Sequence, residues 1–234
     1  YYYDQDKNNI QYLKTWGGTW TEYGAPNAQP DWDNFVDFVD NNPMTIPANY
    51  NIAKSQYNTG SLIDYFLLNA YVVCADWLNW NTGWWRGLDP NGDKKKWRYT
   101  LWDMDNTFGH GTNYTGIPTT GVNADPCDPS SLNDPGGQGH VPIWNEMLTN
   151  EDFFNDYLNR WQDLATTDLS CANMISVLDS MVAVIDPEMP RQIATWGGTY
   201  NEWQSNVQDV RDFILARCST MNNGFIPCYP DLSG

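Results

Sequence analysis

Two short stretches decide how this chain is interpreted: Asp-Trp-Leu-Asn-Trp-Asn at residues 76–81, and Trp-Asp-Met-Asp-Asn-Thr-Phe-Gly at residues 102–109. The first sets an aspartate, Asp76, five residues before an asparagine, Asn81. Phosphoryl transfer from a metal-bound nucleotide needs a carboxylate that orients the attacking hydroxyl, together with amide or carboxylate ligands for the divalent ions. The spacing therefore makes Asp76 a candidate catalytic residue and Asn81 a candidate metal ligand.

The second stretch supplies two further carboxylates, Asp103 and Asp105, at the end of a predicted strand. In an extended segment, side chains two residues apart point to one face. Two carboxylates that close repel each other unless a cation lies between them, and hard oxygen ligands suit Mg²⁺, Mn²⁺ or Ca²⁺. We expect an acidic, metal-binding turn, in which both aspartates bind the metal or one of them only caps the turn.

Asp76 is expected to end a helix. A carboxylate there opposes the negative end of the helix dipole, so the position does not serve helix stability. Taken alone, Asp76 is better explained as a solvated loop residue. Its offset from Asn81 and the presence of Asp103 favour the functional interpretation.

Two arginines, Arg86 and Arg98, flank the acidic region on the predicted hairpin. They are candidate cofactor-binding residues, because a guanidinium group neutralises phosphate oxygens well. The alternative is that they pair with surface carboxylates, which contributes little to stability.

Apolar spacing predicts an α+β fold that is mainly helical and has one β-hairpin. A capping box formed by Thr199 and Glu202 begins the last helix. The predicted elements are a helix over 31–42 begun by Asp31 or Asp33, a loop over 43–58, a helix over 62–76 capped by Ser61, strands over 84–86 and 96–102 joined by a turn at 89–93, a loop over 109–140, and helices over 143–149, 151–165, 172–185, 187–196 and 199–217.

Composition limits the classes of partner. The net charge of −17 argues against binding to nucleic acid or to an anionic membrane through a basic surface. No run of 18 apolar residues is present, so we expect no membrane insertion. The 13 Trp and 14 Tyr residues predict an aromatic-rich core, and they also keep open a surface that binds polysaccharide.

The five cysteines contain no C-x-x-C pair, which argues against a structural zinc site. Cys218 and Cys228 flank a glycine-containing loop, so they are predicted to form a disulfide; Cys127 with Cys171 is a weaker second pair. Cys74 lies in an apolar helical run and is expected to be a buried free thiol. Disulfides predict an extracellular or cell-surface protein.

The Asp-to-Asn spacing equals that of the catalytic loop of protein kinases. The run from residue 60 through Asp76 and Asn81 to the tryptophan-bracketed stretch at 97–109 resembles the CotH family, the spore-coat CotH-like atypical protein kinases. Residues 187–191 and 202–218 resemble the C-terminal helices of secreted bacterial members. The resemblance implies a kinase that transfers the γ-phosphate of ATP, with Mg²⁺ or Mn²⁺, to Ser or Thr of exported or surface proteins. By position it makes Asp76 the catalytic aspartate and Asp103 the leading metal ligand, supported by Asp105 and Asn81.

The family's upstream lobe, which should carry a phosphate-binding lysine, is not evident in this sequence. Lys7, Lys14 and Lys54 are the only early lysines, and none lies in a clear predicted strand. Residues 1–234 are therefore expected to form a single kinase-like domain, a C-lobe without its N-terminal lobe. Two rival interpretations remain: a non-catalytic carbohydrate-binding module, and a cell-surface module in which Ca²⁺ at the acidic hairpin only stabilises the fold.

Overall fold

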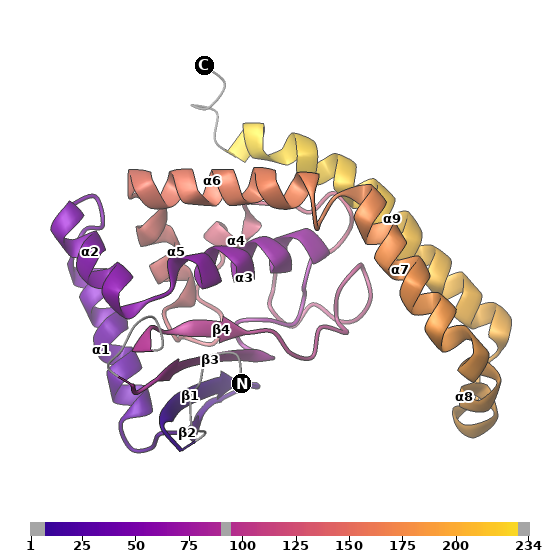
Figure 1. Ribbon diagram of the computed structural model, residues 1–234, viewed down its shortest axis with the longest axis horizontal. Coiled ribbons are helices and arrows are strands. Elements are labelled where there is room, and N and C mark those ends of the chain that lie inside the picture. Colours follow the sequence, from indigo (N-terminus) through magenta and orange to yellow (C-terminus); the bar gives the residue numbers. More distant parts are fainter. Residues whose placement is uncertain (1–7, 90–94, 229–234) are drawn as a thin grey trace.

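The computed structural model describes residues 8–89 and 95–228, and consists of a body of helices over a sheet with a long helical arm extending from it (Figure 1). The predicted hairpin turn at 89–93 lies almost entirely outside the described residues. The elements in chain order are β1 Ile10–Thr15, β2 Thr19–Tyr23, α1 Ala28–Asn41, α2 Pro47–Gln56, α3 Thr59–Val72, β3 Thr82–Gly87, β4 Arg98–Thr100, α4 Asp128–Ser131, α5 His140–Leu148, α6 Glu151–Thr166, α7 Cys171–Ile185, a 3₁₀ turn at Asp186–Glu188, α8 Met189–Trp196 and α9 Tyr200–Cys228.

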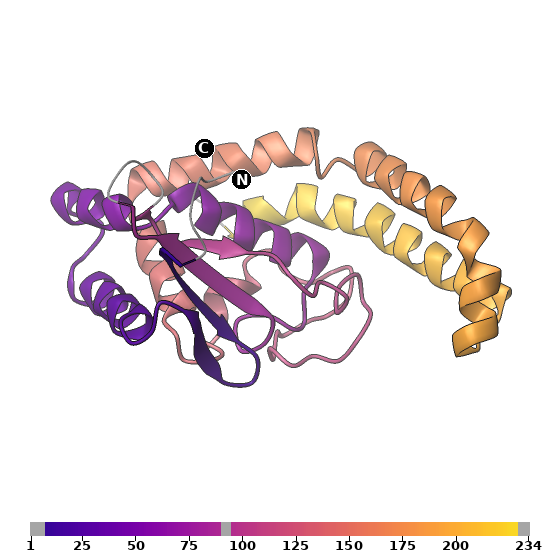
Figure 2. The same cartoon turned by 60° about the horizontal axis from the view of Figure 1, so that its bottom comes forward.

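The sheet has four antiparallel strands in the order β2-β1-β3-β4. The predicted hairpin is present as β3 and β4, with Gly83 opposite Thr100. The hairpin of β1 and β2 was not predicted, although the pair Gly17-Gly18 between two Thr- and aromatic-containing runs is a hairpin signal. One face of the sheet packs on the helices, and Figure 2 shows the strands turned toward the viewer.

The core is aromatic, as predicted. Trp32 of α1 is fully buried, with its ring centroid 5.5 Å from that of Trp84 and 5.4 Å from that of Trp97. Large rings that meet at tilted angles bury much apolar area and fix the packing geometry. This cluster anchors α1 to β3 and to the segment that leads into β4, so it holds the sheet in place under the helices. Among the described residues, no single helix is long and apolar enough to cross a membrane. One bent pair of helical segments, α6 and Cys171–Trp196, has the length and composition for this only when the two are counted together.

Three predictions about helix boundaries were wrong. The first helix begins after Asn27, before Asp31. Residues 47–56 form α2 where a loop was predicted, because Pro47 stands in the first turn, where its missing N–H does no harm. Helix α3 is capped by Asn58, whose Oδ1 accepts a hydrogen bond from the Ser61 amide at 3.0 Å, and it ends at Val72.

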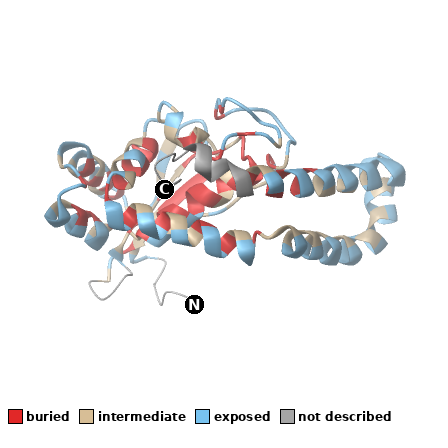
Figure 3. Ribbon diagram, turned by 90° about the horizontal axis from the view of Figure 1, so that it is seen from above, coloured by how far each residue is buried: buried red, intermediate tan, exposed pale blue. Residues whose placement is uncertain are grey.

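The arm is an antiparallel pair, α7 and α9, closed at its far end by α8 (Figure 1). The predicted capping box begins α9: the Glu202 amide donates to Thr199 Oγ1 at 3.2 Å, and Thr199 Oγ1 donates to Glu202 Oε2. Most of the arm is exposed, in contrast to the body (Figure 3).

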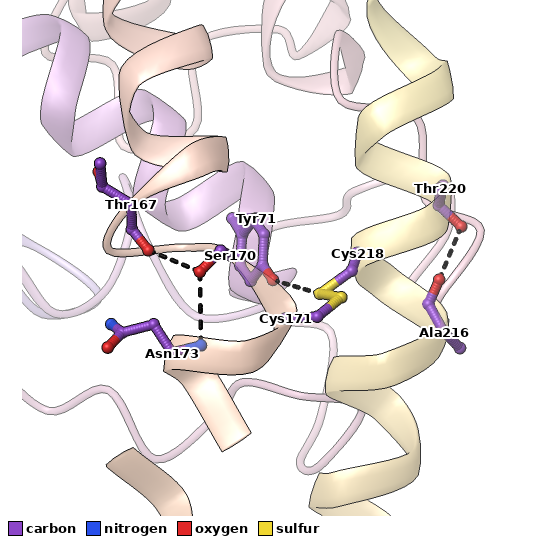
Figure 4. The surroundings of a disulfide bond; sticks show 8 residues. All are labelled: Tyr71, Thr167, Ser170, Cys171, Asn173, Ala216, Cys218 and Thr220. Carbon is purple, nitrogen blue, oxygen red and sulfur yellow. Dashed lines mark hydrogen bonds between the residues drawn. A yellow bond between two sulfur atoms is a disulfide. The ribbon is translucent and has the colours of Figure 1, made fainter. Parts of the chain in front are cut away.

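A disulfide joins Cys171 to Cys218 at the base of the arm, beside the Tyr71 hydroxyl (Figure 4). This pairing contradicts both predicted pairs, Cys218 with Cys228 and Cys127 with Cys171. Cys127 is disulfide-bonded as well. Cys74 is a buried free thiol, as predicted, and burial raises its pKa to about 12.

Candidate functional site

The C-terminal end of α3 is fixed by hydrogen bonds to each of its last four carbonyls, a region of a helix where carbonyls commonly lack partners. The Asn69 carbonyl accepts from the Cys74 amide at 2.9 Å, and the Val72 carbonyl accepts from the Phe108 amide at 2.8 Å. The carbonyls of Ala70 and Tyr71 both accept from the buried guanidinium of Arg217 in α9, at 2.7 and 3.0 Å. The chain leaves the helix from a firmly held position.

The prediction that Asp76 ends the helix was wrong, because α3 ends at Val72. Val73 adopts a left-handed conformation with φ 53°, which stops α3, and Asp76 lies in the loop that follows. A branched residue rarely takes that conformation. The helix-dipole argument for Asp76 therefore fails, and its role depends on its surroundings in the loop.

The loop of Asp76 is joined to the acidic turn by backbone hydrogen bonds. The Ala75 amide donates to the Asn106 carbonyl at 3.1 Å, and the Phe108 amide donates to the Val72 carbonyl at 2.8 Å. The two segments therefore run in opposite directions, and Asp76 lies near Asp105. Asp103 and Asp105 do not lie in an extended segment, since β4 ends at Thr100 and Asp103 has φ 52°. Both carboxylates are exposed. The structure thus brings the two sequence stretches together, by a turn and not by the pleat of a strand.

Asp76 and Asn81 contact each other directly. Asn81 Nδ2 donates to Asp76 Oδ2 at 2.9 Å, and Asn81, 6% exposed, has φ 44°. Strained backbone of this kind persists only where its surroundings hold it, and it is frequent at functional sites. The five-residue offset seen in the sequence therefore corresponds to a side-chain contact.

Several oxygens in this region are buried without a hydrogen-bond partner. They are Oδ1 of Asp76, Asn79, Asn81 and Asn106. Asn106 is 7% exposed and is fixed by a hydrogen bond from its Nδ2 to the Thr112 carbonyl at 2.6 Å. A buried oxygen without a donor is costly, and an ion or a water is the usual explanation. Amide and carboxylate oxygens are the donors that a hard divalent cation takes.

The electrostatics agree with this geometry. Burial raises the pKa of Asp76, and the carboxylates of Asp105 and then Asp103 raise it further, while the Asn106 amide acts in the opposite direction. A carboxylate surrounded in this way gains from a nearby cation. Within residues 8–89 and 95–228, no three acidic, histidine or cysteine side chains form a ready metal cluster. The oxygens that fit a cation are those of carboxylates and amides together.

The two candidate arginines do not share one environment. Arg86 lies on the helix-facing side of β3, where Nη2 is 2.7 Å from Asp31 Oδ2 and Nε donates to Gln11 at 2.6 Å. About 16 Å of strand separates it from Asn81. Arg98, opposite Trp85, lies on the other face of the sheet with its guanidinium carbon 5.2 Å from the centroid of that ring. A phosphate role for either residue stays a prediction. Arg86 forms the pair with a carboxylate that was the alternative, since its guanidinium contacts Asp31.

Sequence reasoning missed Lys14, which lies in a strand, β1, contrary to expectation. It shares the outer face of the sheet with Arg98. Its Nζ is 3.1 Å from Glu22 Oε2, and 5.5 Å from the ring centroid of Trp102, the residue that precedes Asp103. Residues 10–15 are buried at every second position, but two of the three buried residues, Gln11 and Thr15, are polar, so the sequence shows no apolar alternation there.

Comparison with known proteins gives one result. The chain matches a family model described as CotH kinase protein over residues 1–221. No curated protein and no solved structure matches it.

Proposed function

Because the chain belongs to the CotH kinase family, we propose that it is an atypical protein kinase with a kinase-like C-lobe. It transfers the γ-phosphate of ATP to Ser or Thr of an exported or surface protein, with Mg²⁺ or Mn²⁺. A kinase role and the general use of ATP and a divalent metal come from the family. The residue roles, the Ser or Thr acceptor and the extracellular location are our proposal.

The observation that carries the proposal is the set of unpartnered buried oxygens on Asp76, Asn81 and Asn106, beside the exposed carboxylates of Asp103 and Asp105. A set of hard oxygen donors fits Mg²⁺ or Mn²⁺. Asp103, Asp105 and Asn81 would hold these ions. When bound, the ions neutralise charge on the phosphate oxygens during transfer.

Asp76 would be the group that receives the substrate hydroxyl. Its Oδ2 accepts a hydrogen bond from Asn81 Nδ2 at 2.9 Å, which fixes the orientation of the carboxylate. Its Oδ1 is buried without a hydrogen-bond partner, so substrate binding would have to open this oxygen to the hydroxyl. The raised pKa makes Asp76 a better proton acceptor than an exposed aspartate. Asn81 acts as a positioning residue in addition to its proposed metal contact.

Lys14 is our candidate for the phosphate-binding lysine that the sequence did not reveal. In protein kinases a lysine on a strand contacts the phosphates and is paired with a glutamate. Here Lys14 is paired with Glu22 and lies against Trp102, next to the acidic turn. Arg98 is a second cationic residue on the same sheet face.

The test is phosphate transfer from radiolabelled ATP, to the chain itself and to a mixture of Ser- and Thr-containing peptides. Asp103→Ala should reduce transfer at least about a hundredfold, the scale for loss of one preorganised electrostatic contact. Asp209→Ala, an exposed aspartate on α9, is the matched control and should retain the rate. Equal rates for wild type and Asp103→Ala would show that the proposed site is not the catalytic one.

A second candidate function is polysaccharide binding. Trp16 and Tyr114 are 57% and 52% exposed, and both contact Trp80, with ring centroids 5.5 and 5.6 Å apart. Exposed rings that gather from three segments are a surface on which sugar rings could lie. Retention on insoluble polysaccharide by wild type and by Asp103→Ala, and its loss in Trp16→Ala, would support this candidate.

A further inference from the structure

A groove of about 560 Å³ lies between α3, α6 and β4, and the proposed catalytic site does not use it. Its lining includes Tyr65 and Tyr99, whose rings stack with centroids 3.9 Å apart. Asp64 and Asp168 add carboxylates, and Leu101 is 48% exposed. The groove is therefore aromatic, partly aliphatic and acidic.

Of the charged side chains that line the groove, Arg160 is fully paired and the carboxylate of Asp168 is not. All three guanidinium nitrogens of Arg160 are used: Nε and Nη2 bond Asp64 at 2.6 and 3.3 Å, and Nη1 bonds Asp163 at 2.7 Å. Asp168 is exposed and makes no ion pair or side-chain hydrogen bond with any residue that the structure describes. The groove therefore offers a free carboxylate and no free cation, which disfavours an anionic ligand.

The lining of the groove includes one residue, Leu101, that is close in the chain to the proposed metal ligands. Leu101 lies two residues before Asp103, so their Cα atoms are at most about 7 Å apart. A polypeptide that rests on Leu101 and extends over two or three residues would reach the acidic turn.

From these observations we propose that the groove binds a basic segment of the protein substrate, with an Arg or Lys side chain placed against Asp168 and the partly exposed ring of Tyr99. A cation is attracted both by a carboxylate and by an aromatic ring. The net charge of −17 adds a long-range attraction for basic segments. This proposal rests on the proposed kinase function for the identity of the occupant, and its binding step can be tested without catalysis.

The experiment measures fluorescence anisotropy of a labelled 12-residue peptide of Gly, Ser and Leu that carries two arginines, without nucleotide or metal. The companion peptide has citrulline in place of both arginines and so keeps the shape without the charge. Wild type should bind the arginine peptide and should bind the citrulline peptide about tenfold more weakly. Asp168→Lys should weaken binding of the arginine peptide about tenfold, and Asp209→Lys, the same charge change outside the groove, should not.

Three results would overturn the proposal: no binding of the arginine peptide to wild type, equal binding of the citrulline peptide, or unchanged binding to Asp168→Lys. Asp168 is exposed, so the variant should fold, and a melting curve checks this. The same peptides with ATP and Mg²⁺ separate the two proposals. Binding without any transfer would leave the groove in place and refute the kinase assignment; transfer to both peptides with equal KM would refute the groove alone.

Discussion

Replacing Arg217 with methionine should destabilise the body of the protein strongly. The side chain is fully buried and donates to four main-chain carbonyls, those of Ala70, Tyr71, Val122 and Ala124. Two of these are end carbonyls of α3, and two belong to the long loop that follows β4. Methionine has a similar length and no donor, so all four carbonyls would lose this bond inside the protein.

The magnitude follows from the number of bonds. A hydrogen bond from a charged donor contributes about 1.5–3 kcal/mol, but the variant also avoids the burial of the guanidinium, which lowers the pKa of Arg217 to about 10. Taking about 1 kcal/mol net for each bond gives about 4 kcal/mol. That is a large part of the 5–15 kcal/mol typical of a folded protein.

The assay is urea denaturation followed by tryptophan fluorescence, which this chain reports well through its 13 Trp residues. With a slope of about 2–3 kcal/mol per molar urea, the midpoint should fall by about 1.3–2 M. Arg217→Lys keeps the charge with fewer donors and should lie between the two. Arg191→Met, whose side chain is 86% exposed, is the matched control and should change stability by less than about 0.5 kcal/mol. A loss below about 1 kcal/mol in Arg217→Met would refute the reasoning.

Three further predictions concern the site and the arm. Asp76→Asn should raise the melting temperature at pH 7 without divalent ions, because the raised pKa of Asp76 means that folding disfavours its charged form; the gain should disappear as pH falls below the ordinary value of 3.8, and a gain independent of pH would contradict this. Lys14→Met should raise the KM for ATP and slow transfer while lowering stability by less than about 1 kcal/mol; kinetics identical to wild type would remove Lys14 from the site. The double variant Cys171→Ser/Cys218→Ser opens a closure of 47 residues and should lose about 4 kcal/mol in urea melts, whereas an unchanged midpoint would mean that packing alone holds the arm.

The sequence by itself determined the parts of the fold that depend on local pattern. Helical spacing predicted the helices that became α5, α6, α7 and α9, because the stripe of apolar residues repeats within each segment. The turn signal at residues 89–93 and the alternation over residues 96–102 predicted the β3–β4 hairpin. The offset from Asp76 to Asn81 predicted a partnership that is a hydrogen bond in the structure.

Only the tertiary structure decided which distant groups meet. Cys171 pairs with Cys218 because α7 and α9 lie side by side, and no spacing in the sequence carries that information. Lys14 reaches Trp102 because β1 inserts between β2 and β3, a strand order that local alternation does not specify. Arg217 appears in the sequence as an ordinary charged residue of a long helix. Its role exists because a folded chain must satisfy every buried carbonyl, and the donor that does so can come from anywhere along the chain.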